Sequence, residues 1–260
     1  MTETPIDRAH AGMQAAPEND ALRLAYYERL ADAELFLLLE SEAEDDAIAP
    51  RIFDTADGRF VLAFDREERL TAFAGGPAPY AALSGRSLSR MLAGQSMGLG
   101  LNLGVASSET LIPAEALGWL NATLSERPQE TRDTPEELRP PAGLPDRLIA
   151  ALDTKLATAA GLAKLAYLSA VTWKGGKRGH LLALIDPLPG AETALAQAVG
   201  EALIFSGMDA GELDVTFLKA SDPVAARLAK TGLRFDLPQA PKAEAPSAPG
   251  MDPEKPPRLR

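Results

Sequence analysis

The sequence predicts an α+β protein of two small domains, each with a mixed or antiparallel sheet and packed helices. Short alternating apolar stretches and segments of helical periodicity are interleaved along most of the 260 residues. A proline-rich stretch at 125–145 separates these elements into two groups. Hydrophobic residues make up 46% of the chain, which is enough to pack a core in each group.

The domain boundaries are expected where large apolar residues become sparse. The C-terminal segment is rich in proline and has too little apolar surface to order the chain, so we expect a disordered tail. We also expect the N-terminal residues to be unpacked. The predicted division is a disordered N-terminus at 1–17, a first domain at 18–125, a linker at 126–142, a second domain at 143–238 and a disordered tail at 239–260.

The first domain is expected to begin with a helix, because Leu22, Tyr26 and Leu30 share one helical face that either Asn19 or Asp20 could cap. A strand at 34–40 and a hairpin at 51–64 follow, and the Asp57-Gly58 pair is typical of a type I′ turn. The later elements are a helix capped by Asp65 with Glu68 completing a capping box, a strand at 79–83, a helix opened by Ser87, and a helix opened by Pro113 with Leu117, Leu120 and Leu124 on its apolar face.

The second domain is expected to open with a helix that carries leucine at every fourth position, from Leu144 to Leu156. Strands at 165–174 and 179–186 flank a glycine turn. The remaining elements are a helix at 191–206, a strand at 213–219, a short helix from Pro223 to Gly232 and a strand at 233–237. This order predicts a small sheet with helices on one face.

The stretch "GQSMGLGLNLG" at 94–104 has the glycine content of a nucleotide-binding loop. The dinucleotide fingerprint needs G-x-G-x-x-G between a strand and a helix, but Gly98, Gly100 and Gly104 are spaced one residue too far. Leu99, Leu101 and Leu103 alternate with other residues, as in a strand with one buried face. We therefore predict a strand with turns at its ends.

A basic turn at 173–180 is the candidate ligand site. Its glycine amides could hold a phosphate or carboxylate together with the side chains of Lys174, Lys177, Arg178 and His180. The alternative is an exposed hairpin whose charges keep the loop in water, and the sequence favours that interpretation.

No catalytic or metal-binding motif is found. The chain has no cysteine, and its two histidines, His10 and His180, form no pair that could hold zinc. The acidic segment at 40–46 lacks the spacing and the glycine of a calcium loop, so we expect a solvated loop. Trp119 and Trp173 are expected in the cores. We predict no catalytic residues, no metal and no cofactor.

The net charge is −11, with 37 acidic and 26 basic residues. Such a chain is repelled by phosphate backbones and anionic lipid, so we expect neither nucleic acid nor membrane as a partner. The first twenty residues lack the pattern of a signal peptide, and the apolar runs are far shorter than a membrane span. We therefore expect a cytoplasmic location.

Three segments carry a family resemblance: "RFVLAFDREERLTAF" at 59–73, "YAALSGRSLSRMLAGQSMGLGLNLG" at 80–104 and "LIPAEALGWL" at 111–120. In these segments the chain resembles the SseB-like family, which is named for enhanced serine sensitivity. The segments "LAKLAYLSAVTW" and "GHLLALIDPLPG" are similar to the C-terminal domain of that family. Asn102 precedes Leu103, where the family often has proline. The resemblance implies a link to serine metabolism or its regulation and supplies no catalytic residues.

These observations predict a cytoplasmic, non-enzymatic protein that binds another protein or a small metabolite. The alternative is a sensor of an amino acid or anionic ligand, or an enzyme, that uses the basic turn. A ligand is expected in a cleft between the domains. Exposed edge strands would allow a homo-oligomer.

Overall fold

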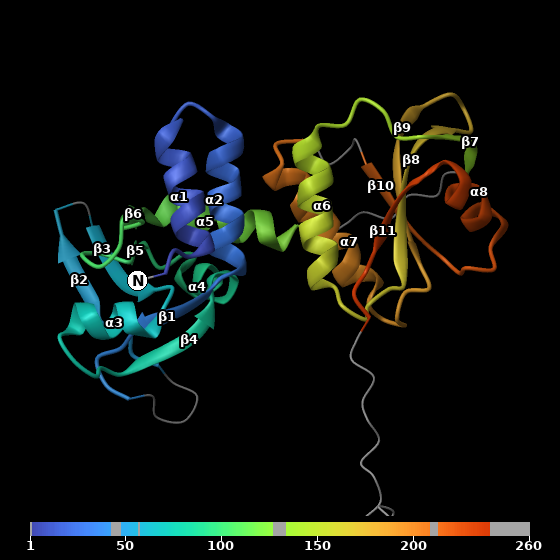
Figure 1. The fold of residues 1–260 in the computed structure, drawn as a ribbon. Helices are drawn as coiled ribbons and strands as arrows, with labels where there is room; N and C mark the ends of the chain where they lie inside the picture. Colours follow the sequence, from blue (N-terminus) through green and yellow to red (C-terminus); the bar gives the residue numbers. More distant parts are fainter. Residues whose placement is uncertain (1, 43–47, 57, 127–133, 209–212, 240–260) are drawn as a thin grey trace, which may run out of the picture.

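The computed structural model describes residues 2–42, 48–56, 58–126, 134–208 and 213–239. Over these residues the chain forms two α+β domains, each built around one mixed sheet, which confirms the predicted fold class (Figure 1). The acidic segment 43–47, the turn residue Asp57, the linker residues 127–133 and the tail 240–260 lie outside the described residues.

The first domain has a sheet with the strand order β4-β1-β3-β5-β6, and β2 pairs with β3. Strands β3 and β5 are parallel, and the other pairs are antiparallel. The elements are α1 (Pro5–Ala15), α2 (Asp20–Asp32), β1 (Glu34–Leu38), β2 (Ile52–Thr55), β3 (Gly58–Phe64), α3 (Glu67–Ala74), β4 (Tyr80–Ser84), α4 (Gly85–Leu92), β5 (Met97–Leu101), β6 (Thr110–Ile112) and α5 (Ala114–Ser125). Helices α1, α2, α4 and α5 cover one face of the sheet, and α3 covers part of the other.

The second domain has a sheet with the order β10-β9-β8-β11, and β7 pairs with β8. Its elements are β7 (Pro135–Arg139), α6 (Asp146–Thr158), β8 (Leu165–Trp173), β9 (Arg178–Ile185), α7 (Glu192–Phe205), β10 (Leu213–Leu218), α8 (Pro223–Thr231) and β11 (Leu233–Asp236). Helices α6 and α7 pack on one face, but α8 packs on the other through Ala225 and Leu228. The prediction of helices on one face is therefore wrong, because β8 and β9 present apolar residues on both faces.

The N-terminal residues are packed, which corrects the prediction of a disordered segment at 1–17. Thr4 caps α1 in a capping box with Asp7, and Pro5 occupies the first turn. The helix buries Ile6, Asp7 and His10 against the first domain. Helix α1 has few large apolar residues, and buried polar contacts help to hold it against the first domain. The composition of the segment does not reveal these contacts.

Part of the predicted linker is also ordered. β7 pairs antiparallel with β8, and Leu138 is buried between that sheet and α8. Prolines flank this strand and do not interrupt it, since Pro135 is its first residue and Pro140 follows its last.

The predicted helix caps are correct for α2, whose N-cap is Asn19, but not elsewhere. Asp65 does not cap α3, whose N-cap Arg66 makes no side-chain bond, because the Asp65 carboxylate is bound by Arg69 and Thr4. Ser84, not Ser87, caps α4.

The two domains are in contact through helices (Figure 1). Figure 1 shows α2 and α5 of the first domain facing α6 and α7 of the second. Phe205 at the end of α7 is buried in the core of the first domain, and its ring centroid lies 6.4 Å from that of Trp119. Trp119 is 40% exposed, so the prediction that it is a core residue is wrong. The Gln197 side chain donates a hydrogen bond to the Leu124 carbonyl at 2.7 Å.

Candidate functional site

The glycine-rich stretch forms the buried strand β5, which confirms the predicted strand. Residues on both faces of β5 are buried, whereas the sequence predicted that only one face is buried. A Cβ at Gly98 would lie 2.4 Å from the Phe60 ring, and one at Gly100 would lie 2.5 Å from a Leu62 methyl group. The glycines therefore make room for large side chains of the neighbouring strand and cradle no phosphate.

A buried polar cluster lies beside the end of β5. We call it the Arg69 cluster, and it consists of Thr4, Asp7, Asp65, Arg69, Asn102 and Ser108. The Arg69 guanidinium donates to both oxygens of Asp7, at 2.9 and 2.6 Å, and to Asp65 at 2.7 Å. The Ser108 hydroxyl donates to Asp7 at 2.5 Å and accepts a bond of 3.0 Å from the Asn102 amide.

These contacts determine the charge state of the cluster. Burial by itself raises the pKa of Asp7, but the hydrogen bonds from Arg69, Ser108 and the Thr4 backbone lower that pKa well below its usual range. Bonding to Asp7 correspondingly raises the pKa of Arg69. Asp7 and Arg69 are therefore both ionised at neutral pH.

A second cluster of charges joins the two domains. We call it the interdomain ion cluster, and it consists of Glu28, Asp32, Arg86, Lys155 and Glu201. Lys155 Nζ of α6 lies 2.6 Å from Asp32 of α2 and 3.4 Å from Glu201 of α7. Arg86 of α4 binds both oxygens of Glu201, at 2.6 and 3.0 Å.

Glu28 is the least satisfied member of this cluster. Its Oε1 lies 3.6 Å from Lys155 Nζ and has no hydrogen-bond partner among the described residues. Burial raises the pKa of Glu28, and the nearby charges of Lys155 and Arg29 offset that effect only in part.

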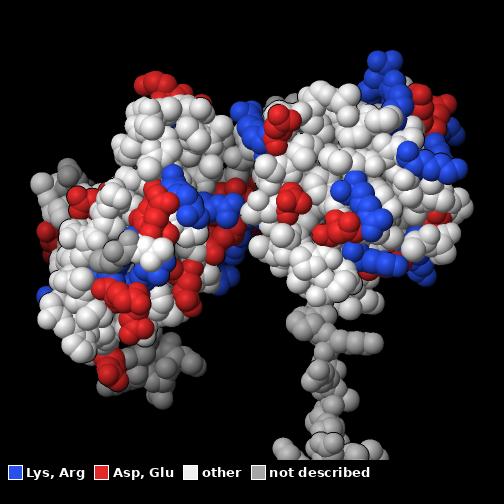
Figure 2. All heavy atoms as spheres, in the orientation of Figure 1, with Lys and Arg blue, Asp and Glu red and all other residues white. Residues whose placement is uncertain are grey.

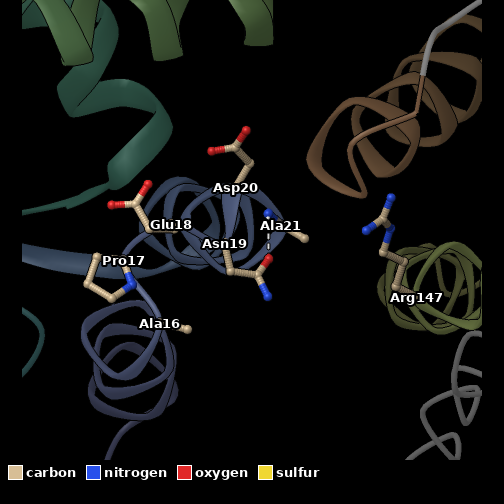
Figure 3. Close-up of a pocket in the computed structure, with 7 residues that line it drawn as sticks. All are labelled: Ala16, Pro17, Glu18, Asn19, Asp20, Ala21 and Arg147. Carbon is tan, nitrogen blue, oxygen red and sulfur yellow. Dashed lines mark hydrogen bonds between the residues drawn. The ribbon is translucent and has the colours of Figure 1, made fainter.

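At the place of the expected interdomain cleft, the structure has an open hollow of about 530 Å³ beside the contact between the two domains (Figure 3). Its wall is formed by the turn between α1 and α2, residues 16–21, and by Arg147 of α6. Figure 3 shows Arg147 on the opposite side of the gap from Asn19. The hollow carries acidic side chains, Glu18 and Asp20, as well as this one arginine, so it has no dominant charge.

The predicted basic turn is exposed at one end of the second sheet. Lys174 and Lys177 flank Gly175 and Gly176, both of which have positive φ, at the hairpin between β8 and β9. Arg178 begins β9 and is exposed. His180 lies further along the strand, where its Nε2 is 3.1 Å from the Ala142 carbonyl. The turn thus brings the two lysines and Arg178 together but leaves His180 engaged elsewhere.

The strand β4 presents a different kind of candidate, an open sheet edge. Its outer side pairs with no strand of the described chain. Tyr80 is 38% exposed and packs edge-on against Phe36 of β1, with ring centroids 5.4 Å apart. Phe73 of α3 is also exposed and contacts Phe64, the register partner of Phe36. Phe36, Phe73 and Tyr80 form what we call the aromatic surface.

Charges of both signs are mixed over the face shown in Figure 2, with no large area of a single sign. In the described residues, no three histidine or acidic side chains are placed to hold a metal ion. None of the helices in the described part of the chain has the length and hydropathy of a membrane span.

The sequence reasoning missed both charged clusters. For the Arg69 cluster a signal was present, because "TPID" at 4–7 has the Thr-x-x-acid pattern of a capping box. For the interdomain ion cluster there was none, since its members come from four separate helices and are ordinary surface residue types.

The fold and these sites define a two-domain α+β protein with a packed polar centre in the first domain and a charged contact between the domains. Residues 9–119 match the family model of the SseB protein N-terminal domain. The chain is thus SseB-like over this range, and its first domain is similar to the SseB N-terminal domain. The match does not extend to the second domain, whose similarity to the family's C-terminal domain stays a prediction. The comparisons with curated proteins and with solved structures gave no match.

Proposed function

We propose that this chain is a non-enzymatic binding protein that pairs β4 with an extended segment of another polypeptide. The observation that carries the proposal is the outer edge of β4, which pairs with no strand of the described residues. Natural sheets guard their edges with charges, prolines or short strands, because an open edge offers unpaired backbone groups to other chains. The lack of cysteine favours action in a reducing compartment such as the cytoplasm.

Strand β4 differs from the other edge strands in the described part of the chain. It is five residues long, "YAALS", and has no charged residue and no proline. β6 has only three residues. Charged residues occur in β2, β7, β10 and β11. The other edges are therefore better protected against pairing.

The hydrogen bonds of β4 leave every second residue free to pair outward. The Leu39 amide bonds to the Pro79 carbonyl and the Gly85 amide bonds to the Ala33 carbonyl, one at each end of the β1–β4 pairing. Because antiparallel bonded pairs alternate, the backbone groups of Tyr80, Ala82 and Ser84 point away from β1. The amides and carbonyls of Tyr80 and Ala82 can pair with an added strand without loss of a bond to β1, whereas Ser84 is the N-cap of α4.

The aromatic surface supplies the side-chain part of the binding. In strand addition, backbone bonds give affinity and pockets for alternate side chains give specificity. Tyr80 is exposed next to Phe36 at the edge strand, and Phe73 extends the surface onto α3. A partner segment with alternating apolar residues fits this arrangement.

The test is site-specific photo-crosslinking in the cells that produce the protein. A photoreactive phenylalanine analogue at Tyr80 should form a crosslink to another polypeptide chain. The same analogue at Leu188, the most exposed large apolar residue of the second domain, is the control. Crosslinks at both positions in equal yield, or at neither, would refute the proposal.

A second candidate function rests on the basic turn. The exposed side chains of Lys174, Lys177 and Arg178 form no ion pair in the described residues and flank two glycine amides. This arrangement favours binding of a small anion or amino acid. The test is a thermal-shift screen with amino acids, including serine, and nucleotides. A stabilising ligand whose effect is lost in Lys177→Glu would support this function, and a shift unchanged in that variant would refute it.

A further inference from the structure

The Arg69 cluster occupies a position where sheets commonly hold ligands. The parallel strands β3 and β5 end at Phe64 and Leu101, and the next residues are Asp65 and Asn102. In open α/β sheets, ligands bind outside the carboxyl ends of the parallel strands, and β3 and β5 are the parallel pair of this mixed sheet. In this domain the position is filled by the chain's own N-terminal segment, residues 4–7.

Four donors converge on the Asp7 carboxylate there, and three of them come from side chains outside the N-terminal segment, since the fourth is the Thr4 backbone amide. Two guanidinium nitrogens of Arg69 bind the two oxygens of Asp7, and the Ser108 hydroxyl binds one of them. This paired arrangement matches the planar fork with which arginine recognises carboxylates. Arg69 is 3% exposed, and its Nε has no hydrogen-bond partner among the described residues, so the guanidinium acts through its two terminal nitrogens, which donate to Asp7 and Asp65.

The donors are positioned by the sheet and not by Asp7. Asn102 has a positive φ of 53°, a conformation that asparagine tolerates better than most residues. Its side chain accepts a bond from the Asp65 amide at 3.1 Å and donates one to Ser108. Asp65 in turn binds Arg69. The site is therefore preorganised by residues that follow β3 and β5.

The residues that donate to the carboxylate lie within the family match, and the residue that carries the carboxylate does not. Asp65, Arg69, Asn102 and Ser108 lie within residues 9–119, which match the SseB N-terminal domain, whereas Asp7 precedes them. The carboxylate-binding side of the contact thus belongs to the matched domain, and the carboxylate comes from outside the matched range.

We propose that Arg69 and Ser108 form a carboxylate-binding site, which Asp7 fills and which takes the carboxylate of a ligand when the N-terminal segment is displaced. Because the segment is tethered, its effective concentration is on the order of millimolar or higher. A simple carboxylate therefore does not displace it from the wild-type chain. A carboxylate ligand binds only when Asp7 is absent, or when other parts of the ligand make further contacts with the protein.

Chemical rescue of the full-length Asp7→Ala variant tests the site. Sodium acetate is compared with sodium chloride at equal ionic strength, and the melting temperature is measured. Acetate should raise the melting temperature of the variant by about 3 °C or more beyond chloride. Wild type and the double variant Asp7→Ala/Arg69→Met should show no such difference. Equal effects of both salts on Asp7→Ala, or equal rescue of the double variant, would overturn the proposal.

A second variant covers the case in which Asp7→Ala does not fold. Asp7→Ser retains a hydroxyl acceptor for Arg69 and also vacates the position of the carboxylate.

A peptide of residues 2–9 and its Asp7→Asn version then distinguish the source of the carboxylate. Acetate rescue alone indicates a small ion, and stronger binding by the acidic peptide indicates a chain segment. Absence of both responses would refute the site.

Discussion

Lys155 of α6 and Asp32 of α2 form a 2.6 Å ion pair across the two domains. The Lys155 side chain is only 7% exposed and also faces Glu28 and Glu201. The interdomain ion cluster already has one carboxylate more than it has cations, so loss of either cation leaves two carboxylates in excess. The contact therefore couples the positions of α2, α4, α6 and α7.

Replacing Lys155 by methionine should destabilise the protein by about 3–5 kcal/mol, because removal of one partner of a buried ion pair leaves the others uncompensated. Urea unfolding followed by circular dichroism measures the change. The exposed Lys230→Met in α8 is the matched control, with an expected change within about 0.5 kcal/mol. Equal stability of the two variants would show that the cluster does not hold the domains together.

Replacing Gly98 by alanine should destabilise the first domain by about 1–3 kcal/mol, since the added methyl group overlaps the Phe60 ring and the Ile112 carbonyl. Gly118→Ala in α5 is the control, because its Cβ meets no atom within 4 Å. That variant should gain up to about 1 kcal/mol from helix propensity. Thermal unfolding of both compares them directly, and a neutral Gly98→Ala would contradict the packing role of the glycine.

The acid dependence of stability should come largely from Asp7. Its pKa is lowered in the folded state, so the folded chain binds protons less readily than the unfolded chain. The stabilisation is complete above the unfolded pKa of about 4 and is lost as the pH falls below it. Urea unfolding at pH 5 and pH 3 should show a clearly smaller loss for Asp7→Asn than for wild type. The same loss in both proteins would assign the effect to other carboxylates.

Much of the fold could be predicted from local patterns. Alternating residues in β8 and β9, the leucines of α6 and the glycine turn between the strands all indicated structures that formed. The basic turn was also found at the expected hairpin. Local patterns were sufficient there because each of these elements is determined by neighbours in the sequence.

The missed features depend on contacts between distant residues. Asp7 meets Arg69 across 62 positions, and Lys155 meets Asp32 across 123. Polar side chains of this kind are usually on the surface, so a single sequence gives no reason to bury them. Trp119 is the opposite case, an apolar residue predicted in a core that is 40% exposed and contacts Phe205 of the second domain.

The central claim is that β4 binds an added strand through its backbone. The direct test is the yield of the Tyr80 crosslink in an Ala82→Pro background, with Ala82→Ser as the control that keeps the amide. Proline removes an outward N–H and leaves the bonds to β1 intact, so circular dichroism should be unchanged. The account predicts that the crosslink is lost in Ala82→Pro and retained in Ala82→Ser. Equal crosslinking in both backgrounds would contradict it.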